Sequence, residues 1–583
     1  MTEESPAEAR ARLFGGSSGA RDSGSGVTNR SFQSVATLVF AVAGLIVVVA
    51  LMAAVQWHGR GYDAEFGTLL SDEPAHYVNG LLVAEYLRHG LFESPLAFAQ
   101  SFYLQYPKVT IGHWPPAFYL LAGAWMAAIS ASKISVLLLS ALLTAMLTVL
   151  VAGIVGRRMG WIAGAVAGLA FALLPLVRDT TLSLMLDVWV GLLSLAATLC
   201  YVQYLNTRRW WPAMLFALFA AVAILSKGNG LELALVPPLA LLASRQFDLL
   251  RQATFWLPAL VVAVLCGPWT ALTYKATQAG FFYTWGLDYF LFALSRNSPF
   301  LLATIGPVGL CLVAVAVAPL LRSGWSLWAI DRPERHFRAG MFSLFLAVFI
   351  FQVLVPASVE TRYLIPALPP LVLLIAAGLQ DVLHWGSRVA APNRASAIGL
   401  LGASLLVLGI IAPDVLALRH WPAKPLLGMV LAAQEIVARL PPDRLALVLV
   451  GSGGEGEGSF VAEIALQDPS RHIVVARGLN MLASGDFGGR DYRTRFESAA
   501  AVADFVNAAA VQFVVIDTSA RSLQWRHMHQ LIEAVSIAGW TRIARYAHDG
   551  VDGETLVYCI NQNLNRQPDM ALLARTIGRR SPF

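Results

Sequence analysis

The chain has 583 residues, of which 57% are apolar and 13% are charged, and its mean hydropathy is +0.61. Soluble domains carry about twice that charged fraction, so the composition excludes a soluble globular protein. Several apolar runs reach the roughly 17–25 residues that a helix needs to cross a bilayer. The sequence therefore predicts a polytopic helical membrane protein, and its net charge of +6 does not indicate nucleic-acid binding.

The N-terminal residues 1–32 are rich in Ser, Gly and Arg, which predicts a disordered cytoplasmic tail. They lack a cleavable signal pattern, so the apolar run that follows is expected to stay as a membrane anchor. The four cysteines have no CxxC spacing, and therefore neither a cysteine metal site nor a disulfide framework is expected.

About eleven apolar segments are predicted to span the membrane. They are 33–56, 134–155, 161–177, 187–205, 211–226, 230–244, 254–273, 299–321, 339–357, 363–380 and 395–412. One more apolar stretch, 115–130, is ambiguous. If it does not cross, the arginines of every later basic loop fall on the cytoplasmic side, as the positive-inside rule requires. We therefore expect a re-entrant or surface helix at 115–130, within a large first external loop over 57–133.

After residue 413 the chain changes to short β-type runs such as LALVLVGS and FVVIDTS, separated by helical stretches. This alternation predicts an α/β domain over 413–583. An odd number of spans places this domain outside, in the periplasm, and the protein in a bacterial inner membrane. The stretch GSGGEG at 451–456 matches a dinucleotide-binding pattern, but Glu455 and Glu457 would repel phosphates, so a flexible loop is the preferred interpretation.

Two carboxylates, Asp72 and Glu73, sit side by side in LLSDEPAHYVNG, shortly after the first span. One interpretation is helix capping, with Ser71 or Asp72 as the N-cap and Pro74 in the first turn. Capping explains one carboxylate but not why both lie at the membrane edge. A partly desolvated carboxylate there could have a raised pKa and act as a general base.

Other ionisable residues are expected at the same external level. His113 precedes the prolines of GHWPPAFYLL and is either an interfacial anchor or a phosphate ligand. Asp187 enters an apolar helix in RDTTLSLMLDVWVGLL and needs a partner, for which Arg178 is a structural candidate. Lys227 and Arg362 sit at helix ends, in SKGNG and ETRYLIPALPP, where they could snorkel or hold a phosphate.

In order and spacing, these motifs resemble the GT-C glycosyltransferases. More narrowly, they resemble the branch that uses polyprenyl-phosphate sugars: protein mannosyltransferases, lipid A aminoarabinose transferases and lipopolysaccharide-core transferases. The resemblance covers roughly 33–412 and departs from the usual pattern where Trp114 separates His113 from the prolines. It implies a transmembrane catalytic domain of GT-C architecture over 33–412. It also implies inverting transfer of a single sugar from a polyprenyl-phosphate donor to a hydroxyl of a lipid, glycan or protein acceptor at the external face.

The resemblance also implies roles for individual residues. Asp72 would activate the acceptor hydroxyl as the base, and Glu73 would support it. The donor phosphate would be held by Lys227, Arg362 and His113. The pocket would be shaped by Asp187, Arg178, Glu360 and Tyr363. Some relatives bind a divalent metal ion, for which the candidate ligands are Asp72, Glu73 and His113.

Two other functions stay open from the sequence. A transporter or flippase of a lipid-linked substrate would show internal repeats of broken helices and ionisable residues at mid-depth, and neither is found in the sequence. A glycan ligase or polymerase that uses a polyprenyl-pyrophosphate donor would need a wider acceptor cleft and more cations than these motifs supply. Membrane lipids are expected partners in every case.

Overall fold

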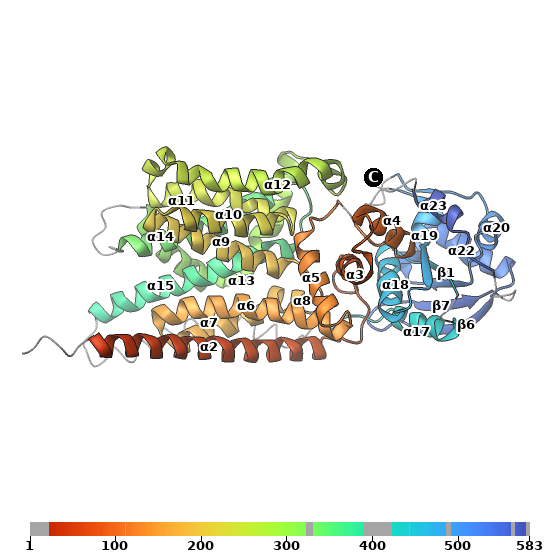
Figure 1. The fold of residues 1–583 in the computed structure, drawn as a ribbon, viewed down its shortest axis with the longest axis horizontal. Coiled ribbons are helices and arrows are strands. Elements are labelled where there is room, and N and C mark those ends of the chain that lie inside the picture. Colours follow the sequence, from red (N-terminus) through yellow and green to blue (C-terminus); the bar gives the residue numbers. More distant parts are fainter. Residues whose placement is uncertain are drawn as a thin grey trace, which may run out of the picture.

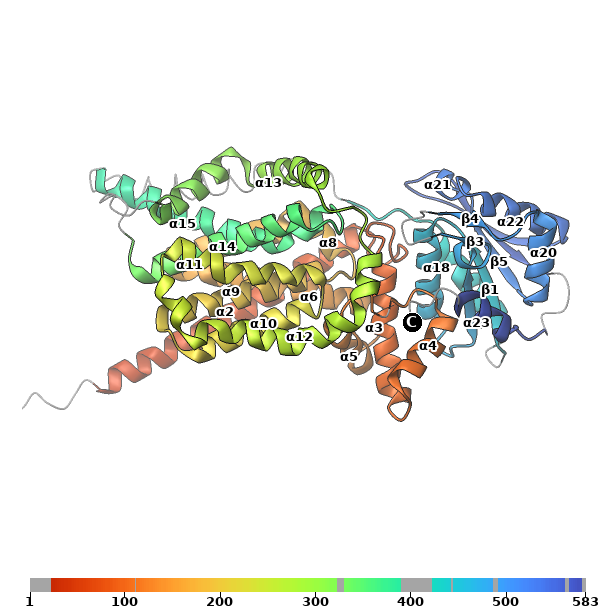
Figure 2. The same cartoon turned by 90° about the horizontal axis from the view of Figure 1, so that it is seen from above.

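The computed structural model describes residues 23–110, 112–321, 330–389, 422–441, 444–485, 491–560 and 566–578. A bundle of long helices lies at one end of the molecule and a mixed α/β region at the other, with α3, α4 and α5 where they meet (Figures 1 and 2). The prediction of a polytopic helical membrane protein with a C-terminal α/β region is confirmed.

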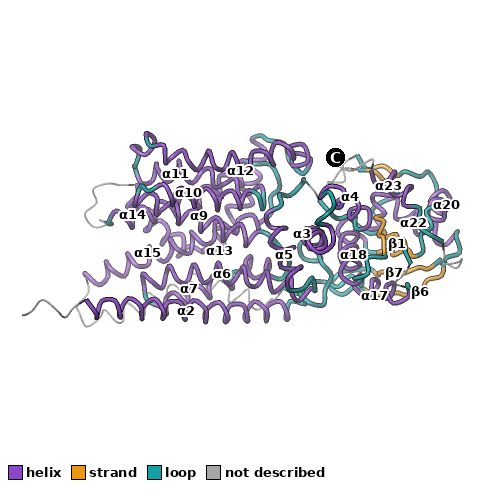
Figure 3. The backbone as a smooth tube through the Cα atoms, in the orientation of Figure 1, coloured by secondary structure: helices purple, strands orange, loops and turns teal. Residues whose placement is uncertain are grey.

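The long helices of the bundle run side by side (Figure 3). They are α2 (Ser23–His58), α6 (Lys133–Met159), α9 (Asp187–Thr207), α12 (Ala253–Ala279), α13 (Leu287–Leu321), α14 (Arg332–Leu354) and α15 (Leu368–Val389), the last preceded by η5 (Thr361–Ala367). Seven helices in the described ranges are long and apolar enough to cross a membrane. The pair α7 (Trp161–Leu173) and α8 (Pro175–Thr181), bent by 63°, makes an eighth if it is one span.

Three predicted segments differ from full-length spanning helices. The segment 211–226 forms α10 (Trp210–Ile224), and 230–244 is divided into η2 (Gly228–Leu235) and α11 (Val236–Ser244), all of them short. The third, 395–412, lies outside the described residues. The number of eleven spans therefore stays a prediction.

The ambiguous stretch 115–130 forms the twelve-residue helix α5 (Ala117–Ala128). Such a helix is about 18 Å long, whereas the hydrocarbon core of a bilayer is about 30 Å thick. It lies at the end of the bundle next to α3 (Glu73–Glu85) (Figure 1). Its length agrees with the expectation that this stretch does not cross. Between α3 and α5 come η1 (Tyr86–Gly90) and α4 (Pro95–Gln105).

The C-terminal region contains a five-stranded sheet of order β2-β1-β5-β7-β6. Its strands are β1 (Ala446–Gly451), β2 (Ile473–Arg477), β5 (Phe513–Asp517), β6 (Thr541–Ala547) and β7 (Glu554–Cys559). β1 pairs in parallel with β2 and β5, while β7 joins β5 and β6 in antiparallel. The parallel strands are continuous apolar runs because helices cover both of their faces.

The helices of this region pack in two layers. α17 (Met429–Arg439) and α18 (Gly454–Gln467) contribute to the hydrophobic cluster on one face of the sheet, and α20 (Ala499–Ala508) and α22 (Arg526–Ile537) to the cluster on the other. The remaining short elements are η3 (Phe247–Arg251) in the bundle and α19 (Gly478–Met481), β3 (Ala483–Ser484), β4 (Arg493–Thr494), α21 (Ala520–Leu523) and α23 (Met570–Gly578) in the C-terminal region.

The Gly-rich stretch 451–456 joins β1 to α18: Gly451 ends the strand, residues 454–456 begin the helix, and only Ser452 and Gly453 lie between them. Its expected interpretation as a flexible loop is therefore wrong. Glu457 is fully buried in the first turn of α18 and accepts a hydrogen bond of 3.0 Å from Nε of Arg477, while Glu455 pairs with Arg521. These carboxylates occupy the place that an anion would need at the helix N-terminus.

The bundle and the C-terminal region share one hydrophobic cluster, to which α3 contributes Tyr77 and α18 contributes Phe460. Buried and half-buried ion pairs cross the same junction: Lys133–Glu463 at 2.8 Å, Lys424–Glu73 at 2.7 Å and Arg471–Glu85 at 2.9 Å. The first external loop of the sequence analysis is thus the segment on which the C-terminal region rests.

Candidate active site

Four ionisable residues from four elements meet at the end of the bundle that adjoins the C-terminal region. Asp72 precedes α3, Asp187 begins α9, Lys227 precedes η2 and Arg362 lies in η5. Arg362 donates a hydrogen bond of 2.5 Å from Nη2 to Oδ2 of Asp72, although the two residues are 290 positions apart. Lys227 donates one of 2.6 Å from Nζ to Oδ1 of Asp187.

Arg362 connects the members of this group. It is 3% exposed, and its Nε lies 3.1 Å from Oε2 of Glu360. The neighbouring Tyr363 carries the Lys227 ammonium 4.1 Å above its ring centroid, a cation–π contact. Oδ2 of Asp187 is buried and has no hydrogen-bond partner among the described residues. Two cations therefore face three carboxylates, and among the described residues one buried carboxylate oxygen, Oδ2 of Asp187, is left without a partner.

Asp72 occupies the N-cap position of α3, but its side chain makes no capping hydrogen bond and turns to Arg362 instead. Burial raises the pKa of Asp72, and the charges of Arg362, His76 and Lys227 outweigh that effect and hold the pKa at about 2. The expected raised pKa is therefore wrong for the protein without substrate. Capping by the Asp72 side chain is excluded as well.

Glu73 is fully buried and points to the scaffold. Oε2 accepts hydrogen bonds from the Gly67 amide at 2.8 Å and from Lys424 at 2.7 Å, and Oε1 accepts one from the Leu184 amide at 3.0 Å. Three donors occupy both oxygens, so Glu73 anchors the start of α3. Lys424 was missed by the sequence analysis because nothing in its local pattern indicates a partner 351 positions away.

His113 lies at the edge of the group, against the end of α12. Its Nδ1 is 3.4 Å from the Ala276 carbonyl oxygen, and a Cβ on Gly280 would lie 2.1 Å from its ring. Burial lowers the pKa of His113, so the imidazole is neutral at neutral pH and can contribute a hydrogen bond but no charge. The last predicted residue, Arg178, is buried and pairs with Asp179 at 2.8 Å.

The three candidate metal ligands do not fit a metal ion. Both oxygens of Glu73 are bound to protein donors, and one oxygen of Asp72 is bound to Arg362. Throughout the described ranges, no group of three or more His, Cys, Asp or Glu side chains could hold a metal ion.

Two further residues of the site were not singled out from the sequence. His76 lies one turn after Asp72, and its Nδ1 is 2.9 Å from the Tyr119 hydroxyl oxygen. Burial, with smaller contributions from nearby cations, lowers the pKa of His76 to about 3. His76 lies four residues after Asp72 in the sequence. This i,i+4 spacing predicts that the two side chains lie on the same face of a helix. Lys108, in the loop after α4, has no such signal, yet its charge acts on Asp72 and His76.

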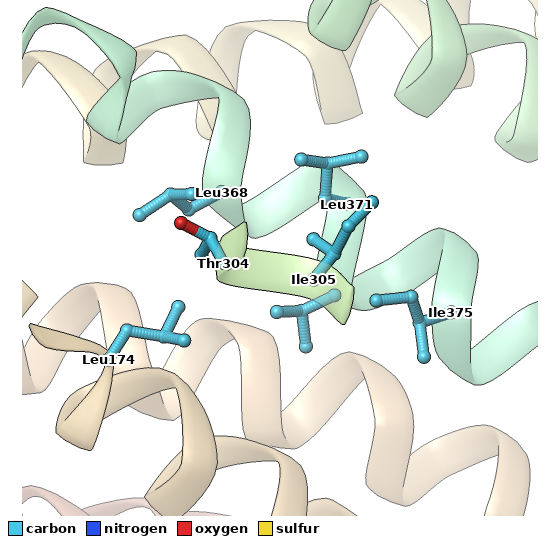
Figure 4. Close-up of a pocket in the computed structure, with 7 residues that line it drawn as sticks. Leu174, Thr304, Ile305, Leu368, Leu371 and Ile375 are labelled. Atoms are coloured by element: carbon cyan, nitrogen blue, oxygen red, sulfur yellow. The ribbon is translucent and has the colours of Figure 1, made fainter. Parts of the chain in front are cut away.

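An apolar pocket lies at the kink of α13, against the start of α15 (Figure 4). Gly306 has φ 62° and ψ 174°, a conformation that favours glycine, and Pro307 follows it without an amide hydrogen. The pocket is lined by Leu174, Thr304, Ile305, Leu368, Leu371, Val372 and Ile375. Leu368 and Leu371 come from the first turn of α15, directly after η5.

Comparisons with known proteins show which proteins this chain resembles. Residues 113–272 match the model of a family described as dolichyl-phosphate-mannose-protein mannosyltransferase. The structure is similar to that of ArnT from Cupriavidus metallidurans in the apo state, with a TM-score of 0.52 at 15% identity, covering 89% of this chain and 98% of that one. No curated protein sequence matches.

Two further solved structures give lower TM-scores. ArnT from Cupriavidus metallidurans bound to undecaprenyl phosphate gives 0.46 at 16% identity, covering 90% and 99% of the two chains. The archaeal oligosaccharyltransferase AglB from Archaeoglobus fulgidus, in complex with an inhibitory peptide and a dolichol-phosphate, gives 0.49 at 14% identity, covering 90% and 75%. The resemblance to GT-C glycosyltransferases of the polyprenyl-phosphate-sugar-dependent branch is confirmed.

Proposed function

We propose that the protein is an inverting glycosyltransferase that moves one sugar from a polyprenyl-phosphate donor to a hydroxyl of an acceptor on the external face of the membrane. The observation that carries this proposal is the contact between Arg362 and Asp72, beside the Lys227–Asp187 pair. It places two cations suited to a phosphate next to a carboxylate suited to a base.

Donor binding changes the partners of these residues. The phosphate of the donor takes the place of Asp72 on Arg362 and receives a second cation from Lys227. Asp72 then keeps its partly buried position without the guanidinium charge, and desolvation raises the pKa of its carboxyl group. The donor thus converts an ionised carboxylate with a pKa of about 2 into an effective base.

The transfer step follows from this arrangement. Asp72 accepts the proton of the acceptor hydroxyl, and the acceptor oxygen forms a bond to the anomeric carbon of the sugar. The bond between that carbon and the phosphate oxygen breaks on the opposite face, which inverts the configuration. The polyprenyl phosphate leaves with its charge held by Arg362 and Lys227. Asp187 keeps Lys227 in place through their 2.6 Å hydrogen bond.

The apolar pocket at the kink of α13 supports a lipid-linked donor. Leu368 and Leu371 follow η5 in the chain, so a lipid attached to a phosphate on Arg362 would meet them first. Six of the seven lining side chains are aliphatic, and such a lining favours an isoprenoid chain over water. We propose that the isoprene units nearest the phosphate pack against these side chains.

Replacement of Asp72 by Asn tests the role of the base. Purified full-length protein in nanodiscs would receive a panel of polyprenyl-phosphate sugars, with membrane extract as the acceptor source. We expect Asp72→Asn to lower the release of polyprenyl phosphate by about 10²- to 10⁴-fold, since Asn cannot accept the proton. Asp63→Asn, an exposed carboxylate of the same loop, serves as the matched control and should keep wild-type release.

Equal release by wild type and Asp72→Asn would contradict the assignment. Donor binding without release from any donor by the wild type would instead favour a transporter of the lipid-linked sugar. Consumption of pyrophosphate-linked glycans alone would favour the ligase or polymerase.

The membrane topology is part of the same proposal. We infer that α10, η2 with α11, and 395–412 also cross, which gives the predicted eleven spans and places the active site and the C-terminal region in the periplasm of a bacterial inner membrane. Alkaline phosphatase fused after residue 578 should be active if the C-terminal region is periplasmic and inactive if it is cytoplasmic.

A further inference from the structure

Lys108 is a cation at the junction between the bundle and the C-terminal region, and it has no partner among the residues that the structure describes. The chain has five lysines, and three of them, Lys133, Lys227 and Lys424, pair with carboxylates at 2.6–2.8 Å. Lys108 lies in a tight turn, its amide 2.7 Å from the Tyr106 carbonyl oxygen. Its ammonium makes neither a hydrogen bond nor an ion pair with any residue that the structure describes.

The ammonium lies against the backbone of α18. A Cβ added to Gly458 would come within 2.9 Å of Nζ of Lys108 and 2.7 Å of its Cε. Only glycine leaves this space open, and glycine within a helix costs about 0.5–1 kcal/mol relative to alanine. The helix α18 is therefore intrinsically less stable at Gly458, the position that Lys108 contacts, than it would be with alanine there.

Arg477 holds the Lys108 turn in place. It ends β2, and its Nη1 donates to the Pro107 carbonyl oxygen at 3.4 Å while its Nε contacts Glu457 at 3.0 Å. Ligands of parallel α/β sheets bind at the carboxyl ends of the strands. The turn that carries Lys108 is thus bonded to the carboxyl end of β2, and the charges of Lys108 and Asp72 act on each other.

We propose that Lys108 binds a phosphate or carboxylate group of the acceptor, so that the enzyme selects anionic acceptors. This inference rests on the proposed glycosyltransferase function. The cations Lys227 and Arg362 belong to the bundle, whereas Lys108 contacts the C-terminal region. An inverting displacement brings the acceptor and the leaving phosphate to opposite faces of the sugar. An acceptor that approaches Asp72 from the side of the C-terminal region would therefore pass Lys108.

The charge of Lys108 also predicts a pH dependence. Desolvation, with a further contribution from Arg477, lowers its pKa to about 8, against smaller opposing effects of Asp72, Glu457 and Glu455. The ammonium is protonated at pH 7 and loses its proton above pH 8. The KM for the acceptor should therefore rise by about tenfold between pH 7 and pH 9. Lys108→Arg should remove this rise because arginine stays charged.

The first test separates the acceptor from the donor. Membrane extract is divided by anion exchange into neutral and anionic fractions, and each is offered with a polyprenyl-phosphate sugar to wild type, Lys108→Met, Lys108→Arg and the exposed control Lys275→Met. We expect wild type to glycosylate the anionic fraction. Lys108→Met should lose about 10- to 100-fold in kcat/KM for that fraction, with unchanged affinity for polyprenyl phosphate. Lys108→Arg should retain most of the wild-type kcat/KM for the anionic fraction, and Lys275→Met should retain all of it.

Several results would overturn the inference while leaving the proposed function intact. These are transfer to the neutral fraction only, equal transfer by Lys108→Met and wild type, or weaker binding of polyprenyl phosphate by Lys108→Met. The last result would assign Lys108 to the donor. Absence of transfer by wild type with every donor would reject the glycosyltransferase function and this inference together.

A second test does not depend on turnover. The lysines are reductively methylated at pH 8.5, and mass spectrometry measures the modification of each of the five. We expect Lys108 to be methylated. Inorganic phosphate should protect Lys108 from methylation but should not protect Lys275. Gly458→Ala displaces the ammonium while it keeps every charge, and it should abolish this protection. Methylation of Lys108 that phosphate does not change would contradict an anion site.

Discussion

At the scale of single residues, the adjacent carboxylates Asp72 and Glu73 have different environments. Asp72 is 22% exposed at its side chain and bonds to a single guanidinium. Glu73 is fully buried and accepts bonds from two backbone amides and from Lys424. The difference follows from their positions at the start of α3, where consecutive side chains point in different directions. One carboxylate faces the bundle site and the other faces the scaffold.

Replacement of Glu73 by Gln should therefore affect folding more than chemistry. Gln leaves the buried Lys424 ammonium without a counter-charge, which costs about 3–5 kcal/mol of unfolding free energy. Thermal unfolding in detergent would measure the loss, and the folded fraction should keep its turnover within about tenfold of wild type.

Glu93→Gln, an exposed carboxylate of the same loop, is the control and should change neither quantity. If Glu73→Gln unfolds like wild type but loses turnover as Asp72→Asn does, Glu73 takes part in the reaction directly.

At the scale of elements, the kink in α13 creates the apolar pocket next to the site. An unbroken helix would place side chains at regular intervals against α15, whereas Gly306 and Pro307 interrupt the backbone hydrogen bonds and change the direction of the helix. Thr304 and Ile305, just before the kink, then line the pocket with Leu371 (Figure 4). The shape of the proposed donor pocket thus depends on two residues that have no reactive side chain.

Filling the pocket should weaken binding of long donors. Thr304→Phe adds a ring to the lining, and we expect the KM for a full-length polyprenyl-phosphate sugar to rise by the equivalent of about 1–2 kcal/mol. A donor cut to two isoprene units should bind as it does to wild type. Leu302→Phe is the control, since Leu302 lies on the same helix but is 48% exposed. An equal effect on short and long donors would place the chain elsewhere.

At the scale of the whole molecule, the C-terminal region is joined to the bundle by charges as well as by apolar packing. Lys133 is 8% exposed and Glu463 is fully buried, and they meet at 2.8 Å across the junction. Glu463 also accepts a hydrogen bond from the Phe66 amide, in the loop that leads to Asp72. The C-terminal region therefore supports the loop that carries the proposed base.

Breaking this pair from one side should destabilise the protein strongly. Lys133→Met leaves Glu463 charged and buried without a cation, at a cost of about 3–5 kcal/mol. The double variant Lys133→Met/Glu463→Leu should recover most of the loss, because no unpaired charge remains. Thermal unfolding in detergent would measure the stability of the single variant and of the double variant.

The exposed pair Arg60–Asp549 offers the comparison, since Asp549→Asn should cost no more than about 1 kcal/mol. A double variant as unstable as Lys133→Met would show that the pair contributes through packing and not through charge.

The amino-acid sequence by itself determined the class of this protein. Long apolar runs predict membrane helices, and alternating β-type and helical runs predict the α/β region, because hydropathy and periodicity are local properties of the chain. The spaced motifs also contain four residues that meet in the candidate site, Asp72, Asp187, Lys227 and Arg362. Tertiary structure decided which of them pair.

Arg362 bonds to Asp72 and Lys227 to Asp187, so Asp72 is ionised where a raised pKa was expected. Glu73 is bound to Lys424, and the predicted span 230–244 is divided into η2 and the short helix α11. Charge pairing depends on distances through space, and each of these pairs joins residues 40 to 351 positions apart. No pattern within a window of the sequence carries that information, which only the packed bundle and its C-terminal region supply.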